Sequence, residues 1–474
     1  MQSIAVTPPG LCADDGDSVA DRFTHSARQT AGLSTAECLD WLARRRRAHN
    51  FQVRQIPFAE LTGWGFDGSG DLVHDSGRFF SLAGLRATRD SGPSATQPII
   101  VQPEVGILGI LVKEFDGVLH CLMQAKMEPG NSNVVQLSPT VQATRSNYTR
   151  IHRGGTTPYL EYFVAPRAGR VLSDALQTEQ GSWFLHKRNR NIVVETDDDV
   201  EVLDDFRWLT VGQVYALLRL ENVVNMDART VLAGMPFAPL PVTEVRDPFG
   251  DALNASLDPV GPARHTMTAV ASWLTEHKAT HELVQQRIPL REVTGWHRDA
   301  DRIARPDGRE FSVIAVDVRA GSREVTTWSQ PLLAPSAYGL MAFLVARIDG
   351  VLHVLLQARA GAGTFDLIEA SPTVQCTPED HADQPPELRP RYLDLVLDAE
   401  ESRIRYDTLL SEEGGRFHHA LNRYRIVEVD AEFAGDEPDE YRWVTVRQLM
   451  GLVRAGNCLN VEARSLLACL LSLR

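Results

Sequence analysis

The segment SPTVQ occurs twice in this chain, at residues 138–142 and at residues 371–375. When residues 38–232 are laid over residues 270–467, identical or similar residues recur in the same order over the whole length. Three further motifs that recur in this way are TGW, DGVLH and RW. Because repeats of solenoid proteins span only roughly 20–50 residues, a repeat of this length indicates that a whole domain has been duplicated in tandem.

The duplication divides the chain into four predicted segments. Residues 34–232 form the first predicted domain, and residues 267–474 form the second. Residues 233–266 are rich in proline and glycine without apolar periodicity, which is typical of a linker. Residues 1–33 combine prolines with acidic residues, and we expect them to be a poorly ordered extension.

Each copy carries the same pattern of expected secondary structure. In the first copy, a capping box at Ser34–Glu37 predicts the start of a helix. Two β-rich runs then flank Asp116-Gly117, and their counterparts flank Asp349-Gly350; Asp-Gly is a strong signal for a two-residue hairpin turn. A helix with apolar residues at helical spacing follows in each copy. This order predicts an α+β or α/β/α fold, made twice, with mixed sheets flanked by helices.

Composition narrows the classes of partner. The formal net charge of −14 argues against a nucleic-acid surface, because a polyanion binds to a dense cationic face. The basic run Arg44–Arg47 lies in a predicted helix and is interpreted as a solvated face. No apolar run reaches the roughly 18–20 residues that a membrane span needs. The six cysteines lack CxxC spacing, which favours reduced thiols and a cytoplasmic location.

Several motifs together resemble one enzyme family. QLSPTVQATRSNYTR at 136–150, PYLEYF at 158–163, FRWLT at 206–210 and the doubled TGW are similar to the NDP-hexose 2,3-dehydratases, which act in deoxysugar pathways for natural-product glycosides. The resemblance covers nearly the whole chain after about residue 35. It implies two Nudix-like domains that arose by gene duplication, a homodimer, and a dTDP-linked 4-keto-6-deoxy-D-glucose substrate. It also implies that one nucleotide-sugar pocket is active and the other is a remnant.

The residues themselves argue against the hydrolysis that Nudix enzymes perform. That reaction needs a Gly-x5-Glu-x7-Arg-Glu-x2-Glu-Glu helix to hold Mg²⁺, and neither copy carries one. The segments after the two hairpins, MEPGNSNVVQLSPTVQ and AGAGTFDLIEASPTVQ, hold too few carboxylates for a hard cation. No glycine-rich dinucleotide fingerprint is present either. We therefore expect neither a metal nor a cofactor.

The implied reaction removes the C2 hydroxyl and leaves a ketone at C3. The C4 carbonyl acidifies the C3 hydrogen, so proton abstraction gives an enediolate from which the C2 hydroxyl departs. Three roles follow: a base at C3, a donor near the C4 oxygen, and an acid for the departing hydroxide.

The two copies diverge immediately after SPTVQ. The first continues as ATRSNYTRIH, which is rich in hydrogen-bond donors and in groups that can move protons. The second continues as CTPEDHADQPP, which is acidic and interrupted by proline. Because a loop that faces a diphosphate would not keep acids and lose every arginine, we predict the active pocket in the first copy and interpret the shared SPTVQ as scaffold.

Five residues are candidates for catalysis. Tyr148 and Tyr159 are predicted to serve as acid or oxyanion donor. Glu161, in an apolar run interpreted as strand-like, and His152 are candidate bases. Lys126 is a candidate to polarise the C4 carbonyl. The alternatives are packing for Tyr159, which has a twin tyrosine in the second copy, and a solvent-exposed hairpin end for Lys126.

A second group of residues is predicted to bind the substrate. Arg145 and Arg150 are candidates for the diphosphate, within a loop that also holds Ser146 and Asn147, and the alternative is surface ion pairs. Four more residues have predicted contacts with the nucleotide sugar: Asn189 and Arg190 with sugar hydroxyls or phosphate, and Trp64 and Trp296 with thymine by stacking or, alternatively, with the core.

Two other functions remain open from the sequence. One is a metal-dependent nucleotide-sugar hydrolase that uses scattered carboxylates, and it would release dTMP when Mg²⁺ is added. The other is a non-catalytic nucleotide-sugar binding protein, which would bind dTDP and leave the 4-keto sugar intact.

Overall fold

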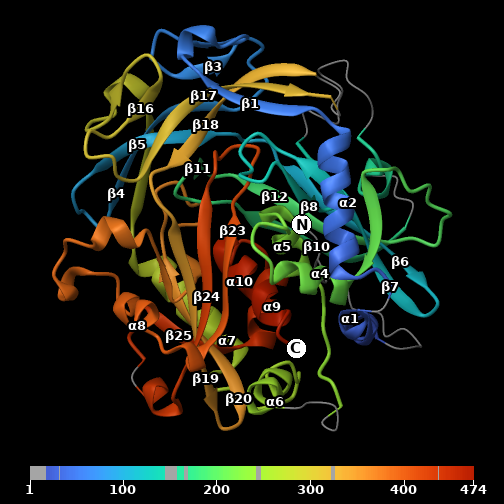
Figure 1. The fold of residues 1–474 in the computed structure, drawn as a ribbon. Helices are drawn as coiled ribbons and strands as arrows, with labels where there is room; N and C mark the ends of the chain where they lie inside the picture. The colour runs from blue at the N-terminus through green and yellow to red at the C-terminus, as the bar shows by residue number, and fades with distance from the viewer. Residues whose placement is uncertain are drawn as a thin grey trace, which may run out of the picture.

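The computed structural model describes residues 18–30, 32–144, 157–164, 169–241, 247–321, 326–435 and 437–474. In this part of the chain, two seven-stranded sheets and two smaller sheets of five and six strands are flanked by helices (Figure 1). Each seven-stranded sheet is mixed and is built from one repeat. The predicted α+β class with mixed sheets and flanking helices, made twice, is confirmed at this level.

The two seven-stranded sheets have the same topology. The first has the order β10-β12-β6-β7-β13, with β8 on β7 and β9 on β6; the second has the order β21-β20-β19-β24-β23, with β25 on β20 and β22 on β19. The strands of the first are β6 Gly106–Phe115, β7 Val118–Met127, β8 Val135–Ser138, β9 Val141–Ala143, β10 Arg170–Thr178, β12 Arg188–Glu195 and β13 Phe206–Thr210. Those of the second are β19 Gly339–Ile348, β20 Val351–Arg359, β21 Glu369–Ser371, β22 Val374–Cys376, β23 Ile404–Ser411, β24 Leu421–Val429 and β25 Tyr441–Thr445.

The predicted hairpins stand at the centre of these sheets. Asp116 and Gly117 have φ values of 49° and 79°, and Asp349 and Gly350 have 50° and 79°. Two consecutive positive φ values define the turn whose twist matches that of antiparallel strands, and glycine accepts the second without strain. The hairpin prediction is therefore confirmed in both copies.

The two smaller sheets exchange a strand between the repeats. β1 (Phe51–Ile56) of the first repeat pairs with β17 (Phe311–Ala320) of the second, and β14 (Leu283–Ile288) of the second pairs with β4 (Ser81–Arg89) of the first. The remaining strands of these sheets are β2 Trp64–Phe66, β3 Leu72–His74, β5 Ala95–Val101, β11 Phe184–Leu185, β15 His297–Arg298, β16 Arg302–Ala304 and β18 Thr327–Pro335. Neither repeat completes its small sheet by itself.

The helices begin where their capping residues predict. Ser34 and Glu37 form the expected capping box at the start of α2, and Thr210 and Thr445 do the same for α4 and α9. The helices are α1 Val19–Arg28, α2 Thr35–Ala48, α4 Val211–Leu218, α5 Met226–Leu232, α6 Pro248–Ala255, α7 Met267–Thr280, α8 Leu393–Leu397, α9 Val446–Ala455 and α10 Val461–Leu471. The 3-10 turns are η1 Phe58–Glu60, η2 Leu160–Tyr162, η4 Leu290–Glu292, η5 Pro378–His381, η6 Pro386–Leu388, η7 Glu401–Arg403 and η8 Ala431–Gly435.

Two predictions about segments outside the repeats were wrong in part. Within residues 1–33, α1 is an ordered helix whose Phe23 is fully buried. Within the predicted linker 233–266, α6 is also an ordered helix with a buried face. Ser26 of α1 donates to the Leu119 carbonyl and accepts from the Val211 amide; Ser256, the residue after α6, makes the equivalent bonds. The duplicated unit therefore includes this helix, whose two copies have diverged in sequence.

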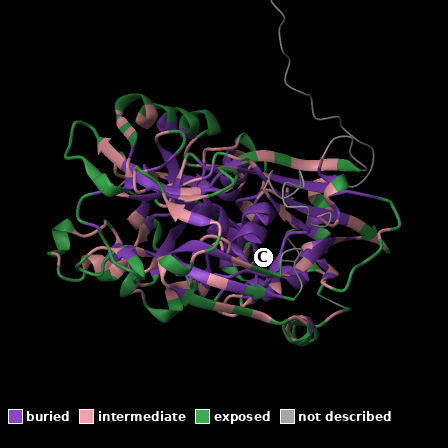
Figure 2. Cartoon of the chain, turned by 90° about the horizontal axis from the view of Figure 1, so that it is seen from above, coloured by how far each residue is buried: buried purple, intermediate pink, exposed green. Residues whose placement is uncertain are grey.

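A single core runs through both repeats. The largest hydrophobic cluster contains buried side chains from each, such as Leu137 and Val231 of the first and Leu352 and Leu466 of the second. Figure 2 shows the buried residues through the middle of the molecule, with exposed ones on the outer helices and loops. Because burying apolar area is the main favourable term in folding, the two repeats stabilise each other.

Two arginines lock the repeats together where α5 meets α10. Arg229 of α5 donates to the Ser411 carbonyl of the second repeat at 2.8 Å. Arg464 of α10 donates to the Thr178 carbonyl of the first, and to Thr230 Oγ1 at 2.6 Å. Both guanidinium side chains are fully buried.

Beside this contact, Glu369 is a carboxyl whose ionisation the fold opposes. Thr178 donates to Glu369, and burial raises the pKa of Glu369 from 4.5 to about 7, although the Thr178 bond and the Arg464 charge lower it. An acid whose pKa is raised by folding loses stability as pH rises from its unfolded value to its folded value. At the equivalent position the first repeat carries Gln136, which accepts from the Ser411 hydroxyl at 2.8 Å.

We therefore expect Glu369→Gln to stabilise the protein at neutral pH. The gain should be absent near pH 4.5 and should grow to on the order of 2 kcal/mol above pH 7. Urea unfolding of wild type and variant at several pH values between these limits measures it. Gln136→Glu, which places a carboxyl at the equivalent point of the first repeat, should do the opposite. A variant curve parallel to that of the wild type would contradict the expectation.

Candidate functional site

SPTVQ forms the tight connection between two short strands in each repeat. In the first, Thr140 Oγ1 accepts from the Leu111 amide at 2.8 Å and donates to the Leu122 carbonyl. In the second, Thr373 makes the same pair of bonds with Leu344 and Leu355. The threonine thus holds this turn across the central hairpin, which explains why both copies keep the motif.

In the first repeat, residues 145–156, which are separated from SPTVQ by two residues, lie outside the described residues. They carry six of the predicted site residues, which therefore stay predictions: Arg145, Ser146, Asn147, Tyr148, Arg150 and His152. β9 contains Gln142 and ends at Ala143, so only Thr144 separates this strand from residue 145. The described residues around Gln142 are therefore those nearest to the start of the predicted loop along the chain.

Lys126 lies beneath this point. Its Nζ donates to the Gln142 carbonyl at 3.1 Å and is 3.9 Å from Glu128 Oε1. The Gln142 side chain donates to Glu128 Oε1 at 2.9 Å and accepts from Asn225, the N-cap of α5, at 3.3 Å. Only 16% of the Lys126 side chain is exposed, so the alternative of a lysine in solvent is wrong.

Around Lys126 lies a group of carboxylates and cations that we call the first-repeat cluster. Its members come from both repeats: Lys126, Glu128, Glu179, Lys187, Asp227, Glu413 and Arg416. Among the described residues, one oxygen each of Glu128, Glu179 and Asp227 is buried without a hydrogen-bond partner. These three residues are 4%, 3% and 2% exposed. A buried polar atom without a partner is costly, and such atoms often mark a functional site.

Burial in the cluster raises the pKa of several of its carboxyls. Burial raises the pKa of Glu179 to about 7, and the nearby Glu413 carboxylate adds to this. Burial raises the pKa of Asp227 well above its usual range, again helped by Glu413. Burial also raises the pKa of Glu413, although the Arg416 guanidinium opposes it. A carboxyl whose pKa lies near 7, such as that of Glu179, can give and take protons at physiological pH.

Tyr159 and Glu161 do not have the surroundings that the sequence predicted. The Tyr159 hydroxyl donates to the Glu201 carbonyl at 2.7 Å and accepts from the Leu203 amide at 3.0 Å, and its ring packs on Phe206. This supports the packing alternative. The predicted strand around Glu161 is wrong: η2 turns the neighbouring aromatic side chains onto the sheet and leaves Glu161 exposed.

Both candidate tryptophans belong to the core between the small sheets. Trp64 and Trp296 are each 8% exposed and share one hydrophobic cluster. The Trp64 ring lies 4.9 Å from that of Phe80, and the Trp296 ring lies 4.7 Å from that of Phe311. Because neighbouring rings cover them, the core alternative is supported and stacking on thymine is not.

Asn189 and Arg190 make the same contacts as their second-repeat twins. Asn189 accepts from the Gly106 amide at 3.1 Å and donates to Glu179 at 2.8 Å, so it orients one carboxylate of the cluster. Arg190 pairs with Asp174, its Nε lying 2.7 Å from Oδ1. A direct role for either residue toward sugar or phosphate stays a prediction.

Most of the first-repeat cluster was not predicted from the sequence. Its members are spread from residue 126 to residue 416, and no motif joins them. One signal was available: TEQGSWF at 178–184 and SEEGGRF at 411–417 are paired turns that differ at a few positions, two of which carry a charge only in the second copy.

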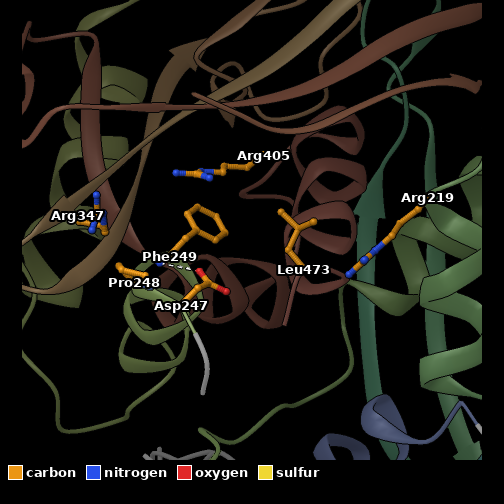
Figure 3. A pocket seen from close by; sticks show the side chains of 7 residues that line it. All are labelled: Arg219, Asp247, Pro248, Phe249, Arg347, Arg405 and Leu473. Atoms are coloured by element: carbon orange, nitrogen blue, oxygen red, sulfur yellow. Dashed lines mark hydrogen bonds between the residues drawn. The ribbon is translucent and has the colours of Figure 1, made fainter. Parts of the chain in front are cut away.

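A surface pocket of about 440 Å³ lies elsewhere, between α6, β19, β23 and the C-terminal end (Figure 3). Its arginines are occupied: Arg347 and Arg405 both pair with Glu428, with Nε to oxygen distances of 2.6 Å. Asp247 accepts from the first amides of α6. The pocket shares no residue with SPTVQ or the cluster, and we do not assign the active site to it.

Two properties of the described ranges bear on function. None of the helices there is long and apolar enough to cross a membrane. No three histidine, cysteine, aspartate or glutamate side chains in these ranges are placed to hold a metal ion.

Known proteins of one family resemble both halves of the chain. The family model for NDP-hexose 2,3-dehydratase matches the chain twice, over residues 35–235 and 267–470. Three relatives carry the name dTDP-4-dehydro-6-deoxy-α-D-glucopyranose 2,3-dehydratase. The protein from Saccharopolyspora spinosa is 50% identical over 100% of this chain and 99% of its own length. Those from Amycolatopsis orientalis and Streptomyces violaceoruber are 49% and 51% identical, over 96% and 91% of this chain and 94% and 96% of their own lengths. The chain therefore belongs to the NDP-hexose 2,3-dehydratase family.

Proposed function

We propose that this protein eliminates water across C2 and C3 of a dTDP-linked 4-keto-6-deoxy-D-glucose, giving a 3,4-diketo-2,6-dideoxyhexose for deoxysugar biosynthesis. The observation that carries the proposal is the identity of about half of all residues, over essentially the whole chain, with three proteins named for this reaction. A carbon–oxygen lyase of this kind fits the first-repeat cluster, which combines the largely buried Lys126 with carboxyls whose pKa burial raises, that of Glu179 to about 7.

The cluster supplies groups for the first half of the elimination. The Glu128 carboxylate has a buried oxygen without a partner in the described chain and is our candidate for the base that removes the C3 proton, in place of the exposed Glu161. The Lys126 ammonium is our candidate for the donor to the C4 oxygen, where negative charge develops in the enediolate. The C2–oxygen bond then breaks, the oxygen leaves as water after receiving a proton, and the enol becomes the 3-ketone. Tyr148 and His152, outside the described residues, remain candidates beside them.

Three finer points belong to the same proposal. The seven-stranded mixed sheets flanked by helices are consistent with Nudix-like domains. The working pocket is placed in the first repeat, because its cluster and its loop carry the groups that move protons. A homodimer and a cytoplasmic location are inferred from family membership and from the reduced cysteines.

The proposal is tested with the purified protein after chelation of metal ions. We expect it to convert dTDP-4-keto-6-deoxyglucose to a product lighter by one water, with the C2 oxygen lost, as followed by mass spectrometry. Substrate labelled with ¹⁸O at C2 identifies the bond that breaks. Release of dTMP only after Mg²⁺ is added would favour a hydrolase, and binding of dTDP with the sugar intact would favour a non-catalytic binding protein. Either result overturns the proposal.

A further inference from the structure

Each repeat inserts a turn into the other at the edge of its central sheet. The Gly130 amide donates to the Gly414 carbonyl at 2.7 Å, and the His419 amide donates to the Gly130 carbonyl at 2.7 Å. In the reciprocal contact, Gly363 donates to Gly181, and the His186 amide donates to the Gly363 carbonyl at 2.9 Å. These paired bonds align the two contacts residue by residue.

The alignment reveals that the two contacts carry different charges. Three charged residues stand in the first repeat's contact: Glu128, Glu413 and Arg416. Lys187, which follows the reciprocal contact's turn, interacts electrostatically with Glu413. The residues at the same places in the other contact are uncharged: Gly361, Gln180 and Trp183. In the other contact, Gln180 is held by a hydrogen bond that it donates to Glu412 at 2.7 Å. Two of these three charges, Glu413 and Arg416, come from the second repeat.

Glu413 and Glu128 face the same point in space. A Cβ placed on Gly415 would lie 3.1 Å from Glu413 Oε1 and 3.6 Å from Glu128 Oε1. Because residue 415 is glycine, no side chain occupies this point next to the two carboxyls. The other carboxyl oxygen, Glu128 Oε2, is buried and has no partner among the described residues, and a buried polar atom without a partner often marks a functional site.

Arg416 holds the turn that carries Glu413. Its Nε donates to Gln102 at 3.1 Å and one terminal nitrogen donates to the Gly415 carbonyl at 2.8 Å. Its guanidinium carbon lies 4.2 Å from the centre of the Phe80 ring, which is a cation–π contact. Arg416 thereby fixes the second repeat's turn to Gln102 and Phe80 of the first repeat.

We propose that the second repeat completes the first repeat's active site by supplying Glu413 as the acid that protonates the departing C2 hydroxyl, with Arg416 as its positioning residue. This inference rests on the proposed elimination. The Glu128 carboxylate takes the C3 proton and the C3–H electron pair forms the enediolate. As the C2–oxygen bond breaks, its electron pair leaves with oxygen, which takes the Glu413 proton and departs as water. The proton on Glu128 then restores Glu413, so no co-reactant is needed.

The test is Glu413→Gln, which installs the residue of the twin turn and removes the proposed proton donor. We expect kcat to fall at least 100-fold, KM to change less than threefold, and the melting temperature not to fall. In D₂O the variant should still exchange the C3 hydrogen for deuterium, because Glu128 still removes it. The matched control is Glu369→Gln, a buried carboxyl of the second repeat, which should keep kcat within twofold.

A second variant leaves every ionisable group in place. Gly415→Ala puts a methyl group between the two carboxyls, and we expect kcat/KM to fall at least tenfold. The inference is overturned if Glu413→Gln keeps more than a third of wild-type kcat, if it loses C3 exchange together with elimination while still folded, or if Gly415→Ala behaves as wild type. Should Glu413→Gln not melt cooperatively, Gly415→Ala decides alone. Wild-type protein that fails to eliminate water would instead refute the proposed function.

Discussion

Replacing Lys126 with methionine is expected to lower kcat for elimination by about 10²- to 10⁴-fold. The ammonium lies in a largely buried setting, 3.9 Å from Glu128, where a positive charge is worth more than in water. Without it, the proposed donor to the C4 oxygen, where negative charge develops, is lost. KM should change much less, because we propose that this group acts on the C4 oxygen in the enediolate and not on the nucleotide. Steady-state kinetics of product formation measures both constants.

The control uses the difference between the two repeats at this position. The second repeat carries Arg359 where the first carries Lys126. Lys126→Arg keeps the charge but replaces a compact ammonium with a planar fork, and we expect most of the activity to be lost. Arg359→Lys makes the reverse exchange in the second repeat and should leave the activity near wild type. Equal losses in both variants would place catalysis in both repeats and contradict our assignment.

Replacing Arg464 with methionine is expected to reduce the free energy of unfolding by about 3–5 kcal/mol. Arg464 is fully buried and donates to the first repeat through Thr178 and Thr230. Its removal breaks these bonds between the repeats and takes a positive charge away from Glu179 and its neighbours. The midpoint of urea unfolding, followed by far-UV circular dichroism, reports the loss.

Arg423→Met provides the comparison for Arg464. Arg423 bonds to a carboxylate, with its Nε 2.6 Å from Asp407, and 53% of its side chain is exposed. Exposed ion pairs contribute about 0–1 kcal/mol, so we expect a change within that range. A similar loss in both variants would mean that the buried guanidinium does not join the repeats.

The elements that depend on local sequence were predicted correctly. The Asp116-Gly117 hairpin and the Ser34 capping box need only neighbouring residues, because a positive φ or an N-cap bond is satisfied within a few positions. The repeat itself was visible because the two copies still share whole motifs. The helices α1 and α6 were missed because their two copies retain little in common beyond Ser26 and Ser256.

The elements that depend on distant residues were not predicted. The strand β1 has the alternating burial of any half-buried strand, and nothing in its six residues names β17 as its partner. In the same way, Glu128, Asp227 and Glu413 come together only in the folded chain. No local sequence pattern predicts that their carboxyls lie close together. The role of Trp64 was ambiguous because a tryptophan ring packs equally well in a hydrophobic core and against a ligand.

The reciprocal exchange of β1 and β14 has a consequence for descent. An ancestor with a single copy would have needed a second molecule to complete its small sheet, and would therefore have existed as a strand-swapped pair of identical subunits. In such a pair, any mutation alters both contacts at once. Fusion of the two genes removed that symmetry, and a glutamate could then arise on one side while glutamine stood on the other.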